Sequence, residues 1–316
     1  MSPSLSQPST PMSALFIDED RLDVTQARIL AIDNYVGERK TLQNVTIEPY
    51  SPVVGATVRG LRLNGVKQLT PELHKFIYDS LLRYGFLAFE PGTVASEDFG
   101  DLVGLFGEAR LMNTPYTPAA NENGGKVNTI DSKVKKTRMN FIWHIDQAFR
   151  HTPPRYTALF GKKVPAFGGD TLFSNATAAY DLLDPLLARY LETLSAVHDV
   201  ETQGFLTLAY QDRDELAAQR SKQPPIEVPL IRVHPETGRK QIFVNELYTL
   251  RILGLSRTAS QSLIDLLLDL VKSPDVQARF RWEEGTALIW DNRTVQHRGV
   301  GDYGDGHRVL HRAVVQ

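Results

Sequence analysis

Residues 287–312 read ALIWDNRTVQHRGVGDYGDGHRVLHR, and this stretch decides the fold class. It begins with a short apolar strand pattern from Ala287 to Trp290, passes through the turn-rich run GVGDYGDG and ends in a second strand pattern. From Gly107 onward the chain repeats this alternation of short strands and Gly, Pro or Asn turns. Many short strands with few long helices favour two packed or closed sheets over a doubly wound parallel sheet. The sequence therefore predicts a mainly β fold with flanking helices.

Regular elements are also expected elsewhere in the chain. The strands predicted from alternating apolar and polar residues are 44–50, 56–63 and 86–89. The helices predicted from apolar stripes and end signals are 71–84, 99–106, one near 176–195 and one near 260–271. The polar stretch 211–225 is interpreted as a surface insertion and a candidate lid. Residues 1–40 are expected to be a disordered Ser/Pro-rich tail with a weakly patterned extension, and residues 41–316 a single domain.

Composition narrows the class of function. The chain is 42% hydrophobic and 23% charged, which is typical of a soluble globular enzyme. A net charge of -2 argues against nucleic acid as a partner. No apolar stretch is long enough for a membrane span and no signal peptide is apparent, so we expect a cytoplasmic protein without a membrane partner and leave a homo-oligomer open. The absence of cysteine means that any metal must be held by nitrogen and oxygen.

One short motif has the spacing of a metal site. His144 and Asp146 lie two residues apart in a strand-like run, so both can project on one face while Ile145 points away. His297 follows the strand pattern at 287–290 and is the best candidate for a third ligand. Two imidazoles and one carboxylate leave three positions open, which suits a non-haem Fe(II) oxygenase. The alternative is that His144 is a core histidine hydrogen-bonded to Asp146.

The tail of the chain carries two arginines that need partners. Arg308 stands eleven residues after His297, and the turn-rich run between them predicts that the chain returns antiparallel to the His297 strand. Arg308, Leu310 and Arg312 would then share one face. Two arginines inside an apolar barrel are costly unless each meets an anion. They lie about 13 Å apart along an extended strand, so they would hold different anions. The alternative for Arg312 is an ion pair with an acid such as Asp291.

At these residues the chain resembles the TauD/TfdA family, which includes taurine dioxygenase and the phenoxyalkanoate dioxygenases. The resemblance covers roughly residues 42–316. The motifs that carry it are WHIDQAF, GGDTLF, FVNELYTLRI, WDNRTVQHRGVGDY and RVLHRA. It implies a double-stranded β-helix, or jelly roll, and an oxidation that consumes 2-oxoglutarate and O2 and releases succinate and CO2.

The resemblance also implies roles for individual residues. His144, Asp146 and His297 would bind Fe(II), and Arg308 with Thr171 would hold the distal carboxylate of 2-oxoglutarate. Without the resemblance, Thr171 would be an ordinary threonine at the start of a strand. Two further positions match residues beside the substrate, namely Asn140 and Arg312.

One departure from the family pattern bears on the substrate. No histidine occurs between His74 and His144, where taurine dioxygenase has histidines that help bind the sulfonate. Met112 and Tyr116 would instead form a more apolar wall. Taurine itself is therefore doubtful, and the resemblance implies a small organic anion such as another sulfonate, an aryloxyalkanoate or an N-substituted amino or fatty acid.

Two other classes of function compete with the oxygenase. A metal-dependent hydrolase could use the same two histidines and carboxylate with a zinc-bound water, but it leaves Arg308 and Arg312 unexplained. A non-catalytic jelly-roll protein could keep the pocket for ligand binding, although the intact ligand set disfavours it. The carboxylate of Asp146 argues against a halogenase, which needs that position for halide.

Overall fold

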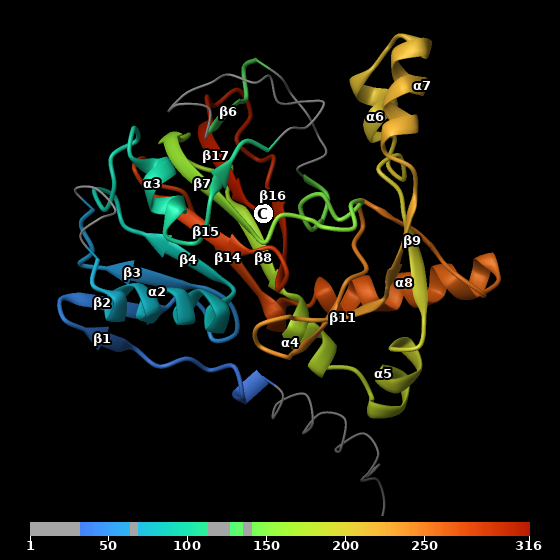
Figure 1. Ribbon diagram of the computed structural model, residues 1–316, viewed down its shortest axis with the longest axis horizontal. Helices are drawn as coiled ribbons and strands as arrows, with labels where there is room; N and C mark the ends of the chain where they lie inside the picture. The colour runs from blue at the N-terminus through green and yellow to red at the C-terminus, as the bar shows by residue number, and fades with distance from the viewer. Residues whose placement is uncertain (1–31, 64–68, 113–126, 135–140) are drawn as a thin grey trace, which may run out of the picture.

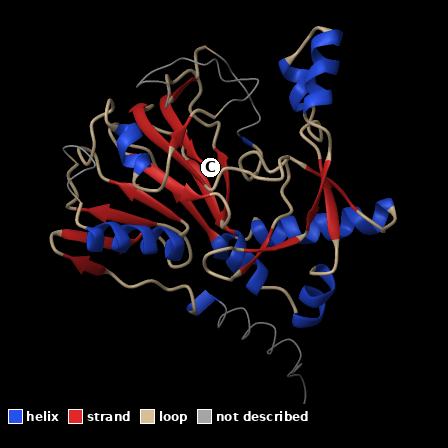
Figure 2. Cartoon of the chain, in the orientation of Figure 1, coloured by secondary structure: helices blue, strands red, loops and turns tan. Residues whose placement is uncertain are grey.

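A computed structural model of the chain describes residues 32–63, 69–112, 127–134 and 141–316. Within these residues β-strands form the centre of the molecule and helices lie around them (Figure 2). The prediction of a mainly β fold with flanking helices is thus confirmed. Among the described residues no helix is both long and apolar enough to cross a membrane. The expected tail at residues 1–31 lies outside the described residues, and the single domain over 41–316 stays a prediction.

The largest sheet runs through most of the molecule. The described strands that build it are β1 (Lys40–Leu42), β2 (Val45–Pro49), β3 (Ala56–Arg59), β4 (Phe86–Phe89), β5 (Ala109–Arg110), β6 (Asn128–Asp131), β7 (Tyr156–Lys163), β15 (Ala287–Asp291) and β17 (Val309–Val315). Their order is β1-β2-β3-β4-β15-β7-β17-β5, and β6 also pairs with β17. The pairings are antiparallel except between β3 and β4.

A smaller sheet faces the large one. Its strands, in the order β14-β8-β16, are β14 (Gln277–Phe280), β8 (Thr171–Asn175) and β16 (Val295–Gly299). Phe86 and Trp290 of the large sheet and Phe173 and Phe280 of the small sheet belong to one buried apolar cluster. Two facing sheets that share one core form the jelly roll that the family resemblance implied.

The remaining strands and the helices cover this core. The other strands are β9 (Ser195–His198), β10 (Ile226–Pro229), β11 (Ile231–Val233), β12 (Lys240–Ile242) and β13 (Thr249–Ile252). The helices are α2 (Pro71–Tyr84), α3 (Phe99–Gly104), α4 (Ala176–Asp181), α5 (Pro185–Leu191), α6 (Phe205–Ala209), α7 (Arg213–Lys222) and α8 (Arg257–Val271), with a 3-10 turn at Pro274–Val276. α2 and α3 pack on the outer face of the large sheet, whereas α6 and α7 project away from it (Figure 1).

The structure corrects several expected boundaries. The helix expected near 176–195 is two helices, because Pro185 cannot donate a backbone hydrogen bond and starts α5 instead of continuing α4. The helix expected at 99–106 ends at Gly104. The polar stretch 211–225 contains α7, which buries none of its side chains. This stretch is a surface element as expected, but it is helical.

Strand β17, which follows Arg308, also pairs differently from the prediction. β17 pairs with β7, β6 and β5 of the large sheet, and not with β16, which contains His297. The prediction that the chain returns antiparallel to the His297 strand is therefore wrong. The run between the two strands is long enough to cross from the small sheet to the large one. His297 and the arginines consequently approach the interior from opposite sheets.

The cap of α2 offers a test of how this helix is held on the large sheet. The Thr70 hydroxyl accepts a hydrogen bond from the amide of Leu73 at 3.2 Å. Thr70→Ala should lower the free energy of unfolding by about 1 kcal/mol, because it leaves an amide at the helix start without its acceptor. Urea unfolding measures the change. Thr70→Ser keeps the hydroxyl and should lose little, so equal losses in both variants would contradict the capping role.

Candidate functional site

Three candidate metal ligands converge between the two sheets. His297 lies on β16, and a two-way backbone bridge joins it to His144, with N–H to O distances of 3.0 Å and 2.9 Å. The segment around His144 forms only this bridge, so the strand expected there is wrong. The expected alternation still holds, since Ile145 is buried in a different apolar cluster while His144 and Asp146 line the cavity.

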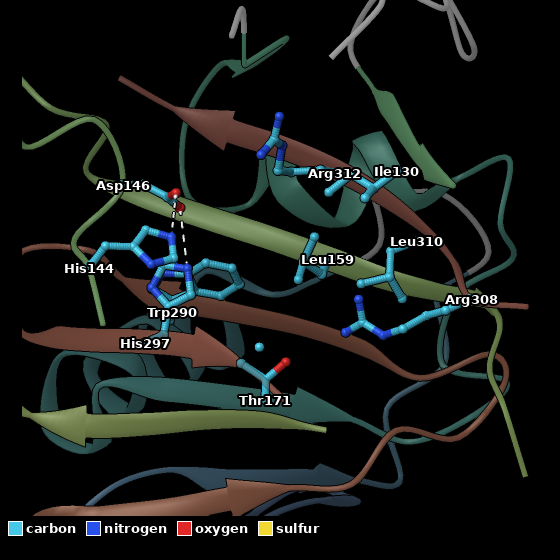
Figure 3. Close-up of a pocket in the computed structure, with 11 residues that line it drawn as sticks. Ile130, His144, Asp146, Leu159, Thr171, Trp290, His297, Arg308, Leu310 and Arg312 are labelled. Carbon is cyan, nitrogen blue, oxygen red and sulfur yellow. Dashed lines mark ion pairs between the residues drawn. The ribbon is translucent and has the colours of Figure 1, made fainter. Parts of the chain in front are cut away.

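The ligand atoms lie close enough to hold one ion. His144, Asp146 and His297 each offer one atom, and these atoms all lie within 4.8 Å of one another. Nε2 of His144 is 3.7 Å from Oδ1 of Asp146, and Nε2 of His297 is 3.8 Å from Oδ2 of the same carboxylate (Figure 3). Two imidazole nitrogens and a carboxylate on one side of a cavity form a donor set suited to Fe(II).

Neighbouring groups orient two of these side chains. Nδ1 of His144 donates to the carbonyl of Ile142 at 2.7 Å, which leaves the lone pair of Nε2 for a metal. The Thr157 hydroxyl donates to Oδ2 of Asp146 at 2.8 Å. The amide of Asn292 accepts from the Asp146 N–H at 2.9 Å and donates to its carbonyl at 3.0 Å. These contacts fix both the backbone and the carboxylate of Asp146.

The charge states of these groups also fit a metal. Burial, together with the charge of the neighbouring His144, lowers the pKa of His297 to about 3, so the His297 imidazole is neutral at ordinary pH. Burial alone would raise the pKa of Asp146, but the two imidazoles and the guanidinium of Arg312 outweigh it and leave the pKa below its ordinary value. A neutral imidazole and an ionised carboxylate are the forms that bind metal.

The cavity extends from the candidate ligands to Arg312 of β17 and to Arg308, which directly precedes this strand. Its apolar wall comes from Ile130, Leu159, Trp290 and Leu310. Arg308, Leu310 and Arg312 all line this cavity, so the three residues expected to share a face do point into one space. Figure 3 shows Arg308 extending toward Thr171, with Arg312 separated from it beyond Leu310. One anion could therefore bind near each guanidinium.

The surroundings of Arg308 suit a carboxylate. Among the described residues none accepts a hydrogen bond from its Nε, and burial lowers its pKa to about 10, so it remains charged at neutral pH. The Thr171 hydroxyl accepts from Nε1 of Trp282 at 3.0 Å and keeps its own proton for another acceptor. A Cβ at Gly169 would lie 3.1 Å from Cδ of Arg308, so the glycine leaves room for this side chain. A planar guanidinium beside a free hydroxyl donor fits the distal carboxylate of 2-oxoglutarate.

Arg312 lies near the candidate metal ligands. Burial lowers its pKa, while the carboxylate of Asp146 and the side chain of Tyr248 oppose that effect. The alternative partner Asp291 is already engaged, since its carboxylate pairs with His234 at 3.0 Å and with Arg293 at 2.8 Å. Arg312 therefore faces the part of the cavity where a substrate would lie next to the metal.

The structure does not place the other predicted substrate residues in this cavity. Met112 is buried and its amide donates to Oδ1 of Asn128 at 2.8 Å, but it does not line this cavity. Tyr116 and Asn140 lie outside the described residues. Sequence reasoning missed Thr157 and Asn292, which hold Asp146. Asn292 lies within the WDNR motif, whereas nothing in the local sequence distinguishes Thr157.

Comparisons with known proteins agree with this geometry. The model of the taurine catabolism dioxygenase TauD, TfdA family matches residues 46–314. An alkylsulfatase of Acinetobacter baylyi is 33% identical over 278 residues, which cover 85% of this chain and 84% of that protein. An alpha-ketoglutarate-dependent sulfate ester dioxygenase of Pseudomonas putida is 29% identical over 276 residues, which cover 85% of this chain and 88% of that protein.

Solved structures give the same result. A taurine dioxygenase from Burkholderia xenovorans aligns with a TM-score of 0.70 and 27% identity over 86% of this chain and 91% of that chain. The cofactors expected from the sequence, Fe(II) with 2-oxoglutarate and O2 as cosubstrates, are those of this group of enzymes. The protein is therefore a non-haem iron(II)- and 2-oxoglutarate-dependent oxidoreductase, and it belongs to the TauD/TfdA dioxygenase family.

Proposed function

We propose that this enzyme oxidises a C–H bond of a small organic sulfur oxyanion, with an alkyl sulfate ester as the leading substrate class. His144, Asp146 and His297 would hold Fe(II). One observation carries the proposal: Arg308, which directly precedes β17, and Arg312 within it have buried Nε atoms and line the same cavity as these three residues. Arg308 would meet the dianionic cosubstrate, and Arg312 would place a second positive charge beside an anionic substrate.

Arg308 and Thr171 are proposed to hold the distal carboxylate of 2-oxoglutarate. Arg308 would form two parallel hydrogen bonds to that carboxylate, and the Thr171 hydroxyl would donate a third. Trp282 keeps both groups in place, because its indole N–H binds the hydroxyl and its ring lies 5.8 Å from the Arg308 guanidinium carbon. These contacts would orient the keto-acid end of the cosubstrate toward His144 and His297.

Arg312 is proposed to bind the anionic group of the substrate. The guanidinium of Arg312 interacts electrostatically with the carboxylate of Asp146. A substrate anion bound to Arg312 would therefore place its adjoining carbon near the candidate metal ligands. Leu159, Leu310 and Ile130 surround this space and exclude water from the reacting carbon. When bound, Fe(II) with 2-oxoglutarate and O2 supplies the oxidising power, with succinate and CO2 as products.

A sulfate ester is favoured over the other anions considered. The two relatives named above, an alkylsulfatase and a sulfate ester dioxygenase, align over more than four fifths of this chain. Hydroxylation of the carbon that bears the ester oxygen gives a product whose C–O bond to sulfate breaks, leaving an aldehyde and hydrogen sulfate. The substrate carbon is oxidised, one oxygen atom of O2 enters the aldehyde, and the other enters succinate.

Location and assembly also belong to the proposal. We infer a cytoplasmic enzyme that works on a small molecule without nucleic acid or membrane as a partner, and we leave a homo-oligomer open. The net charge of -2 supports the inference that nucleic acid is not a partner. Size-exclusion chromatography and cell fractionation test assembly and location.

The metal assignment is tested by anaerobic equilibrium dialysis with Fe(II). His144→Ala should abolish stoichiometric binding, because one of three protein ligands is lost. Thr157→Val should weaken binding by about 10- to 100-fold, since it removes the hydroxyl that orients the Asp146 carboxylate. Thr157→Ser serves as the control and should bind normally. Normal iron binding and turnover by His144→Ala would overturn the ligand assignment.

The cosubstrate assignment is tested by steady-state kinetics with Arg308→Ala. The distal carboxylate would lose its charge-assisted partner, a loss of roughly 2–5 kcal/mol for a buried pair. The KM for 2-oxoglutarate should therefore rise at least about 30-fold. The KM for the organic substrate should change far less. Equal increases in both constants would contradict the assignment.

The substrate class is tested with hexyl sulfate, hexanesulfonate and the uncharged hexyl methyl ether. Hexyl sulfate should give sulfate and succinate in equal amounts, and only when O2 and 2-oxoglutarate are both present. Arg312→Ala should weaken hexyl sulfate binding by roughly 2–5 kcal/mol, and Arg312→Lys should retain part of it. Any slow oxidation of the neutral ether should be unaffected by either change.

Three results would oppose this substrate assignment. Sulfate release without O2 would indicate a hydrolase. If none of the three compounds stimulates 2-oxoglutarate consumption, the proposed substrate class is wrong. A similar fall in activity with charged and neutral compounds, together with a lower melting temperature, would make Arg312 a structural residue.

A further inference from the structure

A second cavity lies behind the candidate metal ligands. It has a volume of about 520 Å3 and shares no lining residue with the cavity of the candidate metal ligands. Ile145 forms part of its wall, whereas the adjacent His144 and Asp146 line the other cavity, so the segment 144–146 contributes to both walls. A cavity of this volume is large enough for a small organic ligand.

Arg232 on β11 lines this cavity and forms no ion pair with the described part of the chain. Its guanidinium carbon lies 3.6 Å from the centre of the Phe243 ring, and that ring stacks on buried His198 at 5.1 Å. The stack fixes the position of the cation. Burial lowers the pKa of Arg232 to about 10, so it is charged at neutral pH. Within the described ranges no residue accepts a hydrogen bond from this side chain or forms an ion pair with it.

The other arginines of the cavity are already engaged. Arg293 pairs with Asp291 at 2.8 Å and with Glu236 at 2.6 Å. Arg155 donates from Nε to the backbone carbonyl of Gln316 at 2.6 Å. Arg232 differs from both in that no carboxylate or carbonyl of the described chain neutralises it. A partly buried cation of this kind is stabilised by an anion from outside the chain.

A polar side chain and an apolar wall complete the site. Gln241 on β12 is the cross-strand neighbour of Arg232, and both line the cavity. The side-chain amide of Gln241 makes no hydrogen bond to the described part of the chain, so its Nε2–H can donate to a ligand. Ile145, Pro153 and Phe243 provide apolar surface beside these two polar groups. The combination fits a ligand with an oxyanion head and an apolar body.

We propose that this cavity is a second binding site, for a small organic anion with an apolar body and an oxyanion head group. The head group accepts hydrogen bonds from the guanidinium of Arg232 and from the Nε2–H of Gln241. The apolar body lies against Ile145 and Phe243. The site is separate from the one in which Arg308 and Arg312 are proposed to act, so its existence does not depend on the proposed reaction.

Fluorescence titration with naphthalene-2-sulfonate tests the proposal on the full chain, independently of turnover. The wild-type protein should bind the sulfonate at least tenfold more tightly than the neutral naphthalene-2-sulfonamide. Arg232→Met keeps the length of the stem and removes the charge, and it should lower sulfonate affinity at least tenfold. Gln241→Leu is a second variant and should lower affinity at least threefold. Melting temperatures establish that each variant is folded.

Two matched variants locate the bound probe. Arg251→Met changes an exposed arginine outside the cavity and should leave sulfonate binding unchanged. Arg312→Met changes the cavity of the candidate metal ligands, and binding to the second site should survive it. Binding that is lost in Arg312→Met and retained in Arg232→Met would place the probe beside the metal and overturn the proposal. Equal affinity for the sulfonate and the sulfonamide, or for wild type and both Arg232→Met and Gln241→Leu, would also overturn it.

Discussion

The two backbone hydrogen bonds between His144 and His297 are the constraint on which the site depends. They attach an irregular segment to the edge of the small sheet and so bring together two imidazoles that are far apart in the sequence. Asn292 then fixes the backbone of Asp146 from the end of β15. A segment without strand pairing of its own is thereby held as firmly as a strand. The cost of ordering it is offset by these bonds and by burial of Ile145.

The sequence predicts the chemistry of this site better than its architecture. The spacing of His144 and Asp146 and the position of His297 are local features, and the fold brings these residues together. The predicted pairing of the strand at 309–315 with the His297 strand was wrong. The eight turn residues 299–306 permit either a hairpin or a crossing to the opposite sheet, and local sequence patterns do not distinguish the two. Pro185 is visible in the sequence as a signal for a helix start. The apolar residues on both sides of it nevertheless led to the prediction of one continuous helix near 176–195. The contact between Thr157 and Asp146 depends on tertiary placement alone.

Charge is distributed through this interior in an ordered way. Arg293 is surrounded by Asp291 and Glu236 and supports the fold, whereas Arg308 and Arg232 have no acidic partner among the described residues. Buried cations of the first kind are satisfied within the protein, and those of the second kind depend on a ligand. The same residue type therefore has two different roles within one domain core. The role of each arginine depends on the residues around it in the fold, and the amino-acid composition does not reveal it.

Strand β17 has a consequence for how this enzyme can change during evolution. Arg308 and Arg312 lie at positions of the same parity, so deletion of one residue between them would turn one guanidinium to the opposite face. A point substitution at position 312 leaves the geometry of position 308 intact. A change of chain length between positions 308 and 312 would therefore alter both sites, whereas a substitution at position 312 would alter only one. Under the proposed roles, the binding site for the cosubstrate would stay fixed while the residue that meets the organic substrate could vary.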